Sequence, residues 1–180
     1  MKVRPDMLDS RSPQGIEIVQ LTDQAGVDSC HIYMEAQIFT PDSKRLVLHR
    51  YAHPHGGDWQ DPRHQYYLCD LENNGTLSPL TDEPRVYAPA ISPDGRYFYY
   101  FVNETDEPKR RLTLKRLRLD TNERETVAVL EGKLPGTNFR LYKEIYPLST
   151  IRSDGNAIAI SAFLGDGVRS NPDWGLLVFD

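Results

Sequence analysis

The sequence feature that most constrains the fold is a turn motif that recurs three times. The copies are Thr40-Pro41-Asp42-Ser43, Ser92-Pro93-Asp94-Gly95 and Arg152-Ser153-Asp154-Gly155. In such a motif Pro presets φ at the second turn position, the Asp side chain bonds back to the backbone, and Gly accepts a positive φ. Each copy precedes a run rich in strand-forming residues, at 46–48, 97–102 and 157–162. We therefore predict that each motif is a tight turn between adjacent antiparallel strands.

A second strand-like run ends on an aspartate at a nearly constant distance after each turn. The distance is 28 residues from Asp42 to Asp70, and the runs ending at Asp120 and Asp180 each lie 26 residues after their turn Asp. Strand-like segments follow at 75–82, where Pro79 is tolerable only at a sheet edge, and at 126–130. Four short antiparallel strands, repeating every 52 and 60 residues from turn to turn, predict β-propeller blades.

The expected fold class is therefore all-β, a partial β-propeller of about three four-stranded antiparallel blades. We expect an N-terminal segment at 1–14 and the propeller at 15–180, with blades near 31–82, 83–131 and 143–180. Residues 15–22 imitate 75–82, so we expect an outer strand that lacks its own blade or pairs with the third. Because propellers typically have about four to eight blades, we expect the N-terminal part of a longer protein. The alternative is an open propeller that self-associates.

Charge and composition exclude several partner classes. The 26 Asp and Glu outnumber the 21 Lys and Arg, for a net charge of −5, so no basic surplus exists for nucleic acid. No apolar run approaches the roughly 20 residues of a membrane helix, and the start has no apolar signal segment. Two cysteines are too few for a disulfide framework or a four-cysteine zinc site. We expect a cytoplasmic protein with neither a nucleic-acid nor a membrane partner.

The loop expected between the second and third strands of the first blade carries most of the candidate functional side chains. It runs from His49 to His64 and holds four of the five histidines. In a four-stranded blade this loop shares one face with the links between blades, and therefore with Cys30-His31. Metal binding by His53, His55 and Asp58, contact with a substrate, and a merely solvated loop are open alternatives.

The same face collects arginines and aromatic side chains. Guanidinium groups bind carboxylates through two parallel hydrogen bonds, and rings such as Trp59 and Tyr33 offer flat surfaces for sugars. Trp174 opens a strand, so we expect it to pack in the core. We assign no catalytic residue and no metal ligand. The candidate substrate-binding residues are His31, Arg50, His53, His55, Trp59 and Arg63.

Several motifs taken together resemble the N-terminal blades of oligogalacturonate lyases. They are Gly15, Gln20-Leu21-Thr22, Cys30-His31, the segment 39–46, Asp58-Trp59, the segment 66–71 and Leu80-Thr81. The resemblance covers residues 15–180 and is strongest before residue 100. The turn motif alone also resembles TolB and the propellers of prolyl oligopeptidase-type peptidases.

The resemblance implies a cytoplasmic seven-bladed propeller that degrades pectin-derived uronate oligomers by β-elimination. In that reaction a base removes the proton α to the carboxylate, while a metal or an arginine neutralises the carboxylate. The family's divalent, manganese-like cofactor and its base belong to later blades, and none of those residues maps onto this sequence. The resemblance thus implies that oligogalacturonate is the ligand, that His31 is the best-matched position, that this segment binds no metal, and that the chain alone is inactive.

Two other functions remain open. A TolB-like propeller would be a scaffold that binds protein or peptide partners. The gating propeller of a serine peptidase would accompany a Gly-x-Ser-x-Gly nucleophile elbow, which this sequence lacks.

Overall fold

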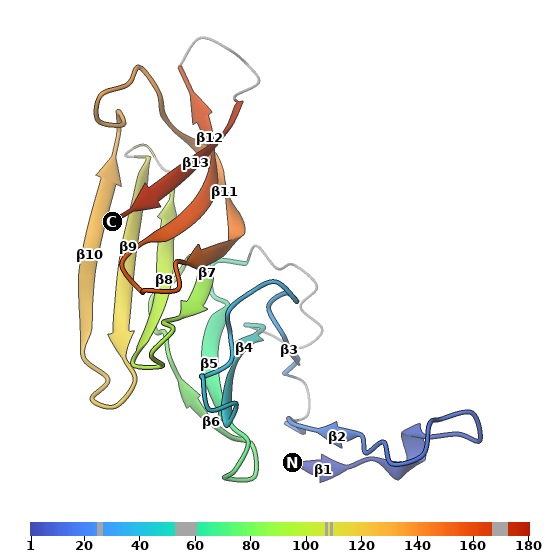
Figure 1. Cartoon of the computed structure of the whole chain (residues 1–180). Helices are drawn as coiled ribbons and strands as arrows, with labels where there is room; N and C mark the ends of the chain where they lie inside the picture. The colour runs from blue at the N-terminus through green and yellow to red at the C-terminus, as the bar shows by residue number, and fades with distance from the viewer. Residues whose placement is uncertain (25–26, 53–60, 107, 109, 167–172) are drawn as a thin grey trace.

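The computed structural model describes residues 1–24, 27–52, 61–106, 108, 110–166 and 173–180, the side chains of 142–144 excepted. Three antiparallel sheets follow one another through the molecule (Figure 1), and a two-stranded ribbon lies at the N-terminus. Within these ranges the sole helical element is a 3₁₀ turn, η1 (Pro5–Met7). None of the described residues forms a helix with the length and apolarity that a membrane crossing needs.

Each sheet is built from strands that are consecutive in the sequence. The first sheet contains β3 (Ser29–Cys30), β4 (Arg45–Arg50), β5 (Gln65–Asp70) and β6 (Thr76–Pro79). The second contains β7 (Val86–Ile91), β8 (Tyr97–Glu104), β9 (Arg111–Arg118) and β10 (Arg124–Glu131). The third contains β11 (Arg140–Ile151), β12 (Ile158–Gly165) and β13 (Asp173–Phe179). All neighbouring strands are antiparallel, as the repeat predicts.

The three predicted turns share one hydrogen-bonding scheme. In each, an Asp Oδ1 accepts a bond from the backbone N–H two residues later, at 3.1, 3.0 and 2.9 Å for Asp42, Asp94 and Asp154. The hydroxyl of Ser92 also donates to Asp94, and this bond leads the contacts that lower the pKa of Asp94 to about 2. The fourth turn residue has a positive φ in all three copies. The sequence motif therefore specifies the turn through local bonds.

Neighbouring sheets meet at these turns. A Cβ added to Gly95, which has a φ of +71°, would lie 2.7 Å from Cδ of Pro41 in the preceding turn. Beside the turns, the backbone oxygen of Gln37 accepts a bond from Ile91 N–H at 2.7 Å, and its side-chain oxygen accepts one from Ile151 N–H at 2.8 Å. Gln37 thus links all three sheets.

Two apolar clusters fill the spaces between the sheets. Phe98, Tyr100 and Leu117 of the second sheet pack with Tyr66 and Leu68 of the first. On its other side the second sheet meets the third through a cluster that includes Ala88, Phe101, Leu112, Leu114, Ile158 and Ile160. Each sheet therefore buries one face against its neighbour, as stacked repeats require.

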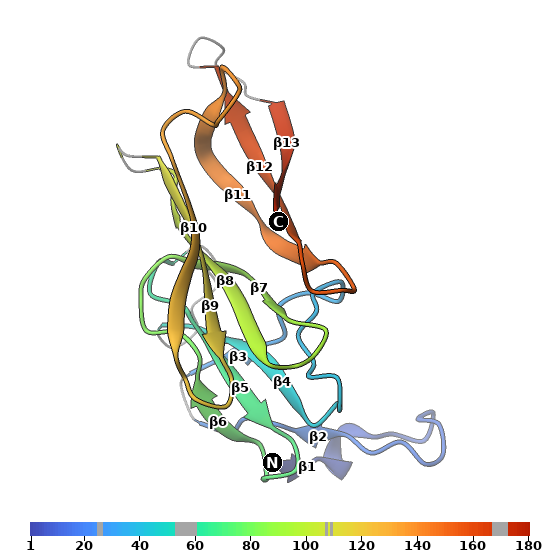
Figure 2. The same cartoon turned by 60° about the vertical axis from the view of Figure 1, so that its left-hand side comes forward.

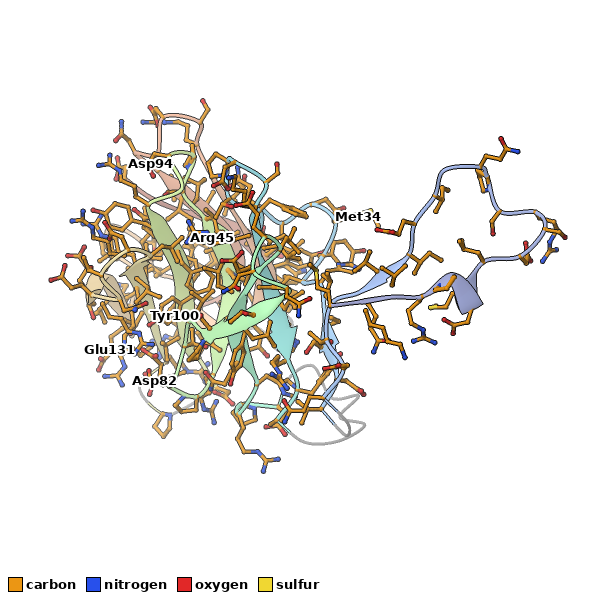
Figure 3. The ribbon with its side chains drawn as sticks, turned by 90° about the horizontal axis from the view of Figure 1, so that it is seen from below. Met34, Arg45, Asp82, Asp94, Tyr100 and Glu131 are labelled. Atoms are coloured by element: carbon orange, nitrogen blue, oxygen red, sulfur yellow. The ribbon has the colours of Figure 1, made fainter. Side chains whose placement is uncertain are left out.

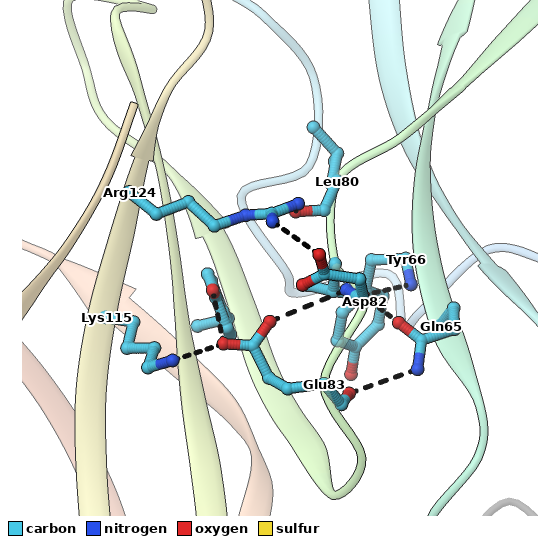
Figure 4. Close-up of polar contacts among 9 residues, drawn as sticks. Gln65, Tyr66, Leu80, Asp82, Glu83, Lys115 and Arg124 are labelled. Carbon is cyan, nitrogen blue, oxygen red and sulfur yellow. Dashed lines mark hydrogen bonds and ion pairs between the residues drawn. The ribbon is translucent and has the colours of Figure 1, made fainter. Parts of the chain in front are cut away.

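Polar bonds close the junction between the first and second sheets (Figure 4). The Glu83 carboxylate accepts bonds from Lys115 Nζ and, at 3.0 Å, from the Tyr100 hydroxyl. Burial alone would raise the pKa of Glu83, but the hydrogen bond from Lys115, with a second contribution from Asp82, holds it at about 2. Arg124 donates to Asp82 at 2.8 Å. The link between β6 and β7 is therefore tied to the outer strands of the second sheet.

The N-terminal segment projects from the first sheet (Figures 2 and 3), which it contacts where the Met1 amino group donates to the Asn74 backbone oxygen at 2.8 Å. Its strands β1 (Lys2–Val3) and β2 (Val19–Gln20) pair with each other, so the segment 15–22 does not pair with the third sheet. The physical reason is that β1 supplies an adjacent antiparallel partner, while Leu21 packs on the outer face of the first sheet with Leu46 and Cys69.

Candidate functional site

A pocket of about 330 Å³ lies where the innermost strands of the three sheets come together. Figure 3 places Asp94, in a turn, and Asp82, in the link between sheets, on opposite sides of the molecule. The pocket opens at the end of the strands that carries the links. It is lined by Cys30, Ile32, Tyr33, His49, Tyr51, Tyr66, Val86, Tyr87, Tyr146, Pro147 and Leu148.

Three of the lining tyrosines come from equivalent places in the repeat. Tyr33 lies nine residues before Asp42, Tyr87 seven before Asp94, and Tyr146 eight before Asp154. Each blade thus supplies one tyrosine from the segment before its turn motif: Tyr33 between β3 and β4, Tyr87 in β7, and Tyr146 within β11. Sequence reasoning missed these positions except Tyr33, although the recurrence of Tyr before each turn is a signal that would have found them.

A cluster of imidazole, phenol and thiol groups forms one wall. The rings of His49 and His64 lie edge to face with centroids 4.8 Å apart, and Tyr51 meets His64 at 4.9 Å. The Cys30 sulfur is 3.9 Å from Nδ1 of His49 and 3.8 Å from the Tyr51 oxygen. His64 is buried, and its Nδ1 accepts a bond from Ala52 N–H at 3.0 Å. These bonds fix the rings in place.

The imidazole of His49 in this wall is uncharged at neutral pH. Burial, with the neighbouring His64 second, lowers the pKa of His49 to about 4. The hydrogen bond with Cys30 leads the causes that raise the pKa of Tyr51, and burial raises that of Tyr66. Among the described residues, no lysine, arginine or carboxylate lines the pocket. The site is therefore a neutral, aromatic surface with hydroxyl and imidazole edges.

The structure does not bring together the candidate substrate-binding residues that were predicted from the sequence. His31 is exposed and follows Cys30 without lining the pocket. Arg50 points to the other face of β4, with its guanidinium 5.1 Å from the Tyr67 ring and Nη2 2.6 Å from Gln24 Oε1. Arg63 is exposed and pairs with Asp61 at 2.7 Å. His53, His55 and Trp59 lie outside the described residues.

The expectation that Trp174 packs in the core is wrong. Its side chain is 52% exposed and stacks on Phe163 with ring centroids 3.9 Å apart. The physical reason is its place on β13, an edge strand of the third sheet, on a face that no other described sheet covers.

The cluster around Cys30 and His49 does not fit a divalent cation. Within the described ranges, no three His, Cys, Asp or Glu side chains are placed to share a metal ion. Nδ1 of His64 is already occupied by the bond from Ala52 N–H. The described residues thus offer fewer than the three protein ligands that a catalytic zinc-type site needs.

Solved structures supply the comparison. An oligogalacturonate lyase in complex with manganese superposes with a TM-score of 0.56 at 21% identity, over 83% of this chain and 33% of its own. A prolyl endopeptidase gives a TM-score of 0.50 at 16% identity, over 91% of this chain and 24% of its own. TolB from Acinetobacter baumannii gives a TM-score of 0.43 at 18% identity, over 81% of this chain and 40% of its own. No protein-family model and no curated protein matches the sequence.

This chain has a β-propeller fold. The prediction of an all-β partial propeller with about three antiparallel blades is confirmed: the three sheets are its blades, the third with three strands in the described residues. The chain spans about a third of the length of the lyase it matches. The pocket lies at the end of the blades where the links between them run.

Proposed function

We propose that this propeller binds short uronate oligomers as part of an oligogalacturonate lyase-like protein of the cytoplasm. The pocket shared by three blades carries the proposal, because tyrosine rings offer apolar faces to sugar rings and hydroxyl edges to their hydroxyl groups. The fold likeness to a manganese-bound oligogalacturonate lyase supports it. Two free thiols, Cys30 and Cys69, suit a reducing compartment.

Arg50 is the group best placed to bind a uronate carboxylate. It lies at the end of β4, on the face opposite His49, and its hydrogen-bond partner Gln24 is uncharged. Arg63, in contrast, already pairs with Asp61. An oligomer that leaves the pocket across the end of β4 would place a carboxylate against Arg50. The base and metal of a β-elimination would then come from outside the described residues.

Calorimetric titration of the chain with digalacturonate tests the proposal. Arg50→Gln should weaken binding at least tenfold, because a hydrogen bond to a charged group contributes about 1.5–3 kcal/mol, and added salt should weaken it further. Arg45→Gln, at the opposite end of β4, is the matched control and should bind as the wild type does. Equal affinity in wild type and Arg50→Gln, or no binding at all, contradicts the proposal. Ultraviolet absorbance should show no unsaturated product from the chain alone.

A second candidate is a propeller that serves as a scaffold for a protein partner. Trp174, Leu176 and Val178 form an exposed apolar stripe on β13, and such stripes mark contact surfaces. If digalacturonate fails to bind while Leu176→Glu abolishes association with a macromolecular partner, the scaffold function is the better account.

A further inference from the structure

The described residues that line the pocket include no lysine, arginine, aspartate or glutamate. Burial also keeps the imidazole of His49 neutral at pH 7, with a pKa of about 4. At the same end of the strands, three arginines form ion pairs within the chain. The pairs are Arg63–Asp61 at 2.7 Å, Arg85–Asp106 at 2.6 Å and Arg111–Glu104 at 2.6 Å.

A free carboxylate would lose its hydration in this pocket and would meet no cation among the lining residues that the structure describes. Moving an ion out of water costs several kcal/mol unless an opposite charge or several hydrogen bonds replace the water. Hydroxyl groups, by contrast, lose little, because tyrosine hydroxyls and imidazole edges replace the hydrogen bonds of water. The chemistry of the lining therefore selects an uncharged ligand that carries hydroxyl groups.

The size and the shape of the site select a single ring. A volume of about 330 Å³ lies at the low end of the roughly 300–1,000 Å³ of small-molecule sites. Tyr33 and Tyr146 are 48% and 45% exposed, so their rings are open to a ligand at the rim. Tyr66 is buried in the blade beneath. One sugar ring fits this arrangement better than a longer oligomer.

We propose that the pocket is a subsite that prefers an uncharged pyranose, the methyl ester of a galacturonate unit, over the free acid. The identity of the sugar rests on the proposed function, while the preference for an uncharged group rests on the described lining alone. With Arg50 outside the pocket, the preferred ligand is an oligomer with an esterified unit in the pocket and a free carboxylate at Arg50. The propeller would then distinguish partly esterified oligomers from fully acidic ones.

The test uses two probes that differ at one carboxyl group, which is ionised in methyl galactosiduronate and esterified in its methyl ester. Saturation-transfer NMR and calorimetry on the chain at pH 7.5 should show the ester binding at least tenfold more tightly than the acid. Tyr33→Ala and Tyr146→Ala should each weaken ester binding several-fold. Phe139→Ala removes an exposed aromatic ring that does not line this pocket, and should leave ester binding unchanged.

A charge inserted into the pocket gives a second, independent readout. Ile32→Arg places a guanidinium in the lining, and should reverse the preference so that the acid binds more tightly than the ester. Ile16→Arg, on the exposed N-terminal segment, should leave the preference as it is in the wild type. Because this readout is a change of selectivity, a loss of folding cannot imitate it.

The outcomes of these experiments test the subsite and the proposed function independently of each other. Tighter binding of the acid by the wild type, or ester binding that is unaffected by Tyr33→Ala, Tyr146→Ala and Ile32→Arg alike, overturns the subsite. If digalacturonate still binds through Arg50 in that case, the proposed function stands alone. If the ester binds in the pocket but no uronate oligomer binds through Arg50, the subsite stands and the proposed function falls.

Discussion

His49 shows how one side chain joins the fold to the site. Its ring lies on the side of β4 that faces the second blade, against His64 and Tyr66, and its edge meets the Cys30 thiol. Burial keeps the imidazole neutral, with a pKa of about 4. The same burial that makes the pocket uncharged therefore makes the folded state resist protonation at this position.

This resistance predicts a loss of stability in mild acid. The unfolded chain takes up a proton on His49 near its ordinary pKa of about 6.5, whereas the folded chain does so only near 4. Stability from this group is thus complete above pH 6.5 and falls as the pH drops towards 4, by about 2 kcal/mol between pH 7.5 and 5. Urea unfolding of wild type and His49→Gln at both pH values measures the difference. A pH effect of equal size in both proteins would place the titrating group elsewhere.

Individual residues also show which features could be predicted from the sequence and which could not. The three turns could be predicted because each is specified by bonds within a few residues, such as Ser92 to Asp94 at 2.6 Å. The pocket could not, because Tyr33, Tyr87 and Tyr146 are separated by 54 and 59 residues in the sequence and line one pocket only when three blades stack. Arg50 was nominated for its charge, but strand alternation turns it to the face opposite His49.

Among the elements, the turns both end the strands and join the blades. Gly95 has a positive φ and lies against Pro41 of the preceding blade, whereas Gly132 has a similar φ of +66° with nothing within 4 Å of an added Cβ. Substitutions at these two glycines therefore distinguish the cost of backbone strain, which both share, from the cost of a lost contact between blades, which only Gly95 has.

Alanine substitutions at these two glycines should differ in cost. Gly132→Ala should lose about 1–2 kcal/mol, the cost of a left-handed backbone for an L-residue. Gly95→Ala should lose more, by about 1–3 kcal/mol, because the methyl group also pushes Pro41 away. Urea midpoints at constant m-value measure both costs. Equal losses of unfolding free energy would mean that Pro41 moves aside at no cost and that its contact with Gly95 does not stabilise the junction between the blades.

At the scale of the whole molecule, the three blades cover one another unequally. The second blade is buried on both faces, and the outer face of the first is covered in part by Leu21. The outer face of the third exposes Trp174, Leu176 and Val178. A repeat buries its apolar face against the next repeat, so this stripe has the character of an interface between blades.

The exposed stripe predicts that the 180-residue chain self-associates. Sedimentation velocity should show species larger than the monomer that grow with concentration. The double substitution Leu176→Lys and Val178→Lys should return the chain to a monomer, because it places charges on the stripe. The matched control is the double substitution Val127→Lys and Val129→Lys at exposed positions on β10, and this variant should still self-associate. If the wild-type chain remains a monomer at high concentration, the exposed stripe does not drive self-association and this prediction is wrong.

The measurement that tests the central claim most directly is NMR of the ten tyrosines, labelled selectively and titrated with digalacturonate carrying one methyl ester. If the pocket shared by three blades is the ligand site, the shifts should concentrate on Tyr33, Tyr51, Tyr66, Tyr87 and Tyr146. Tyr97 and Tyr99, near the turns at the other end of the second blade, should remain unchanged. Shifts at Tyr97 and Tyr99 instead, or no shift at any tyrosine at saturating ligand, would contradict the account.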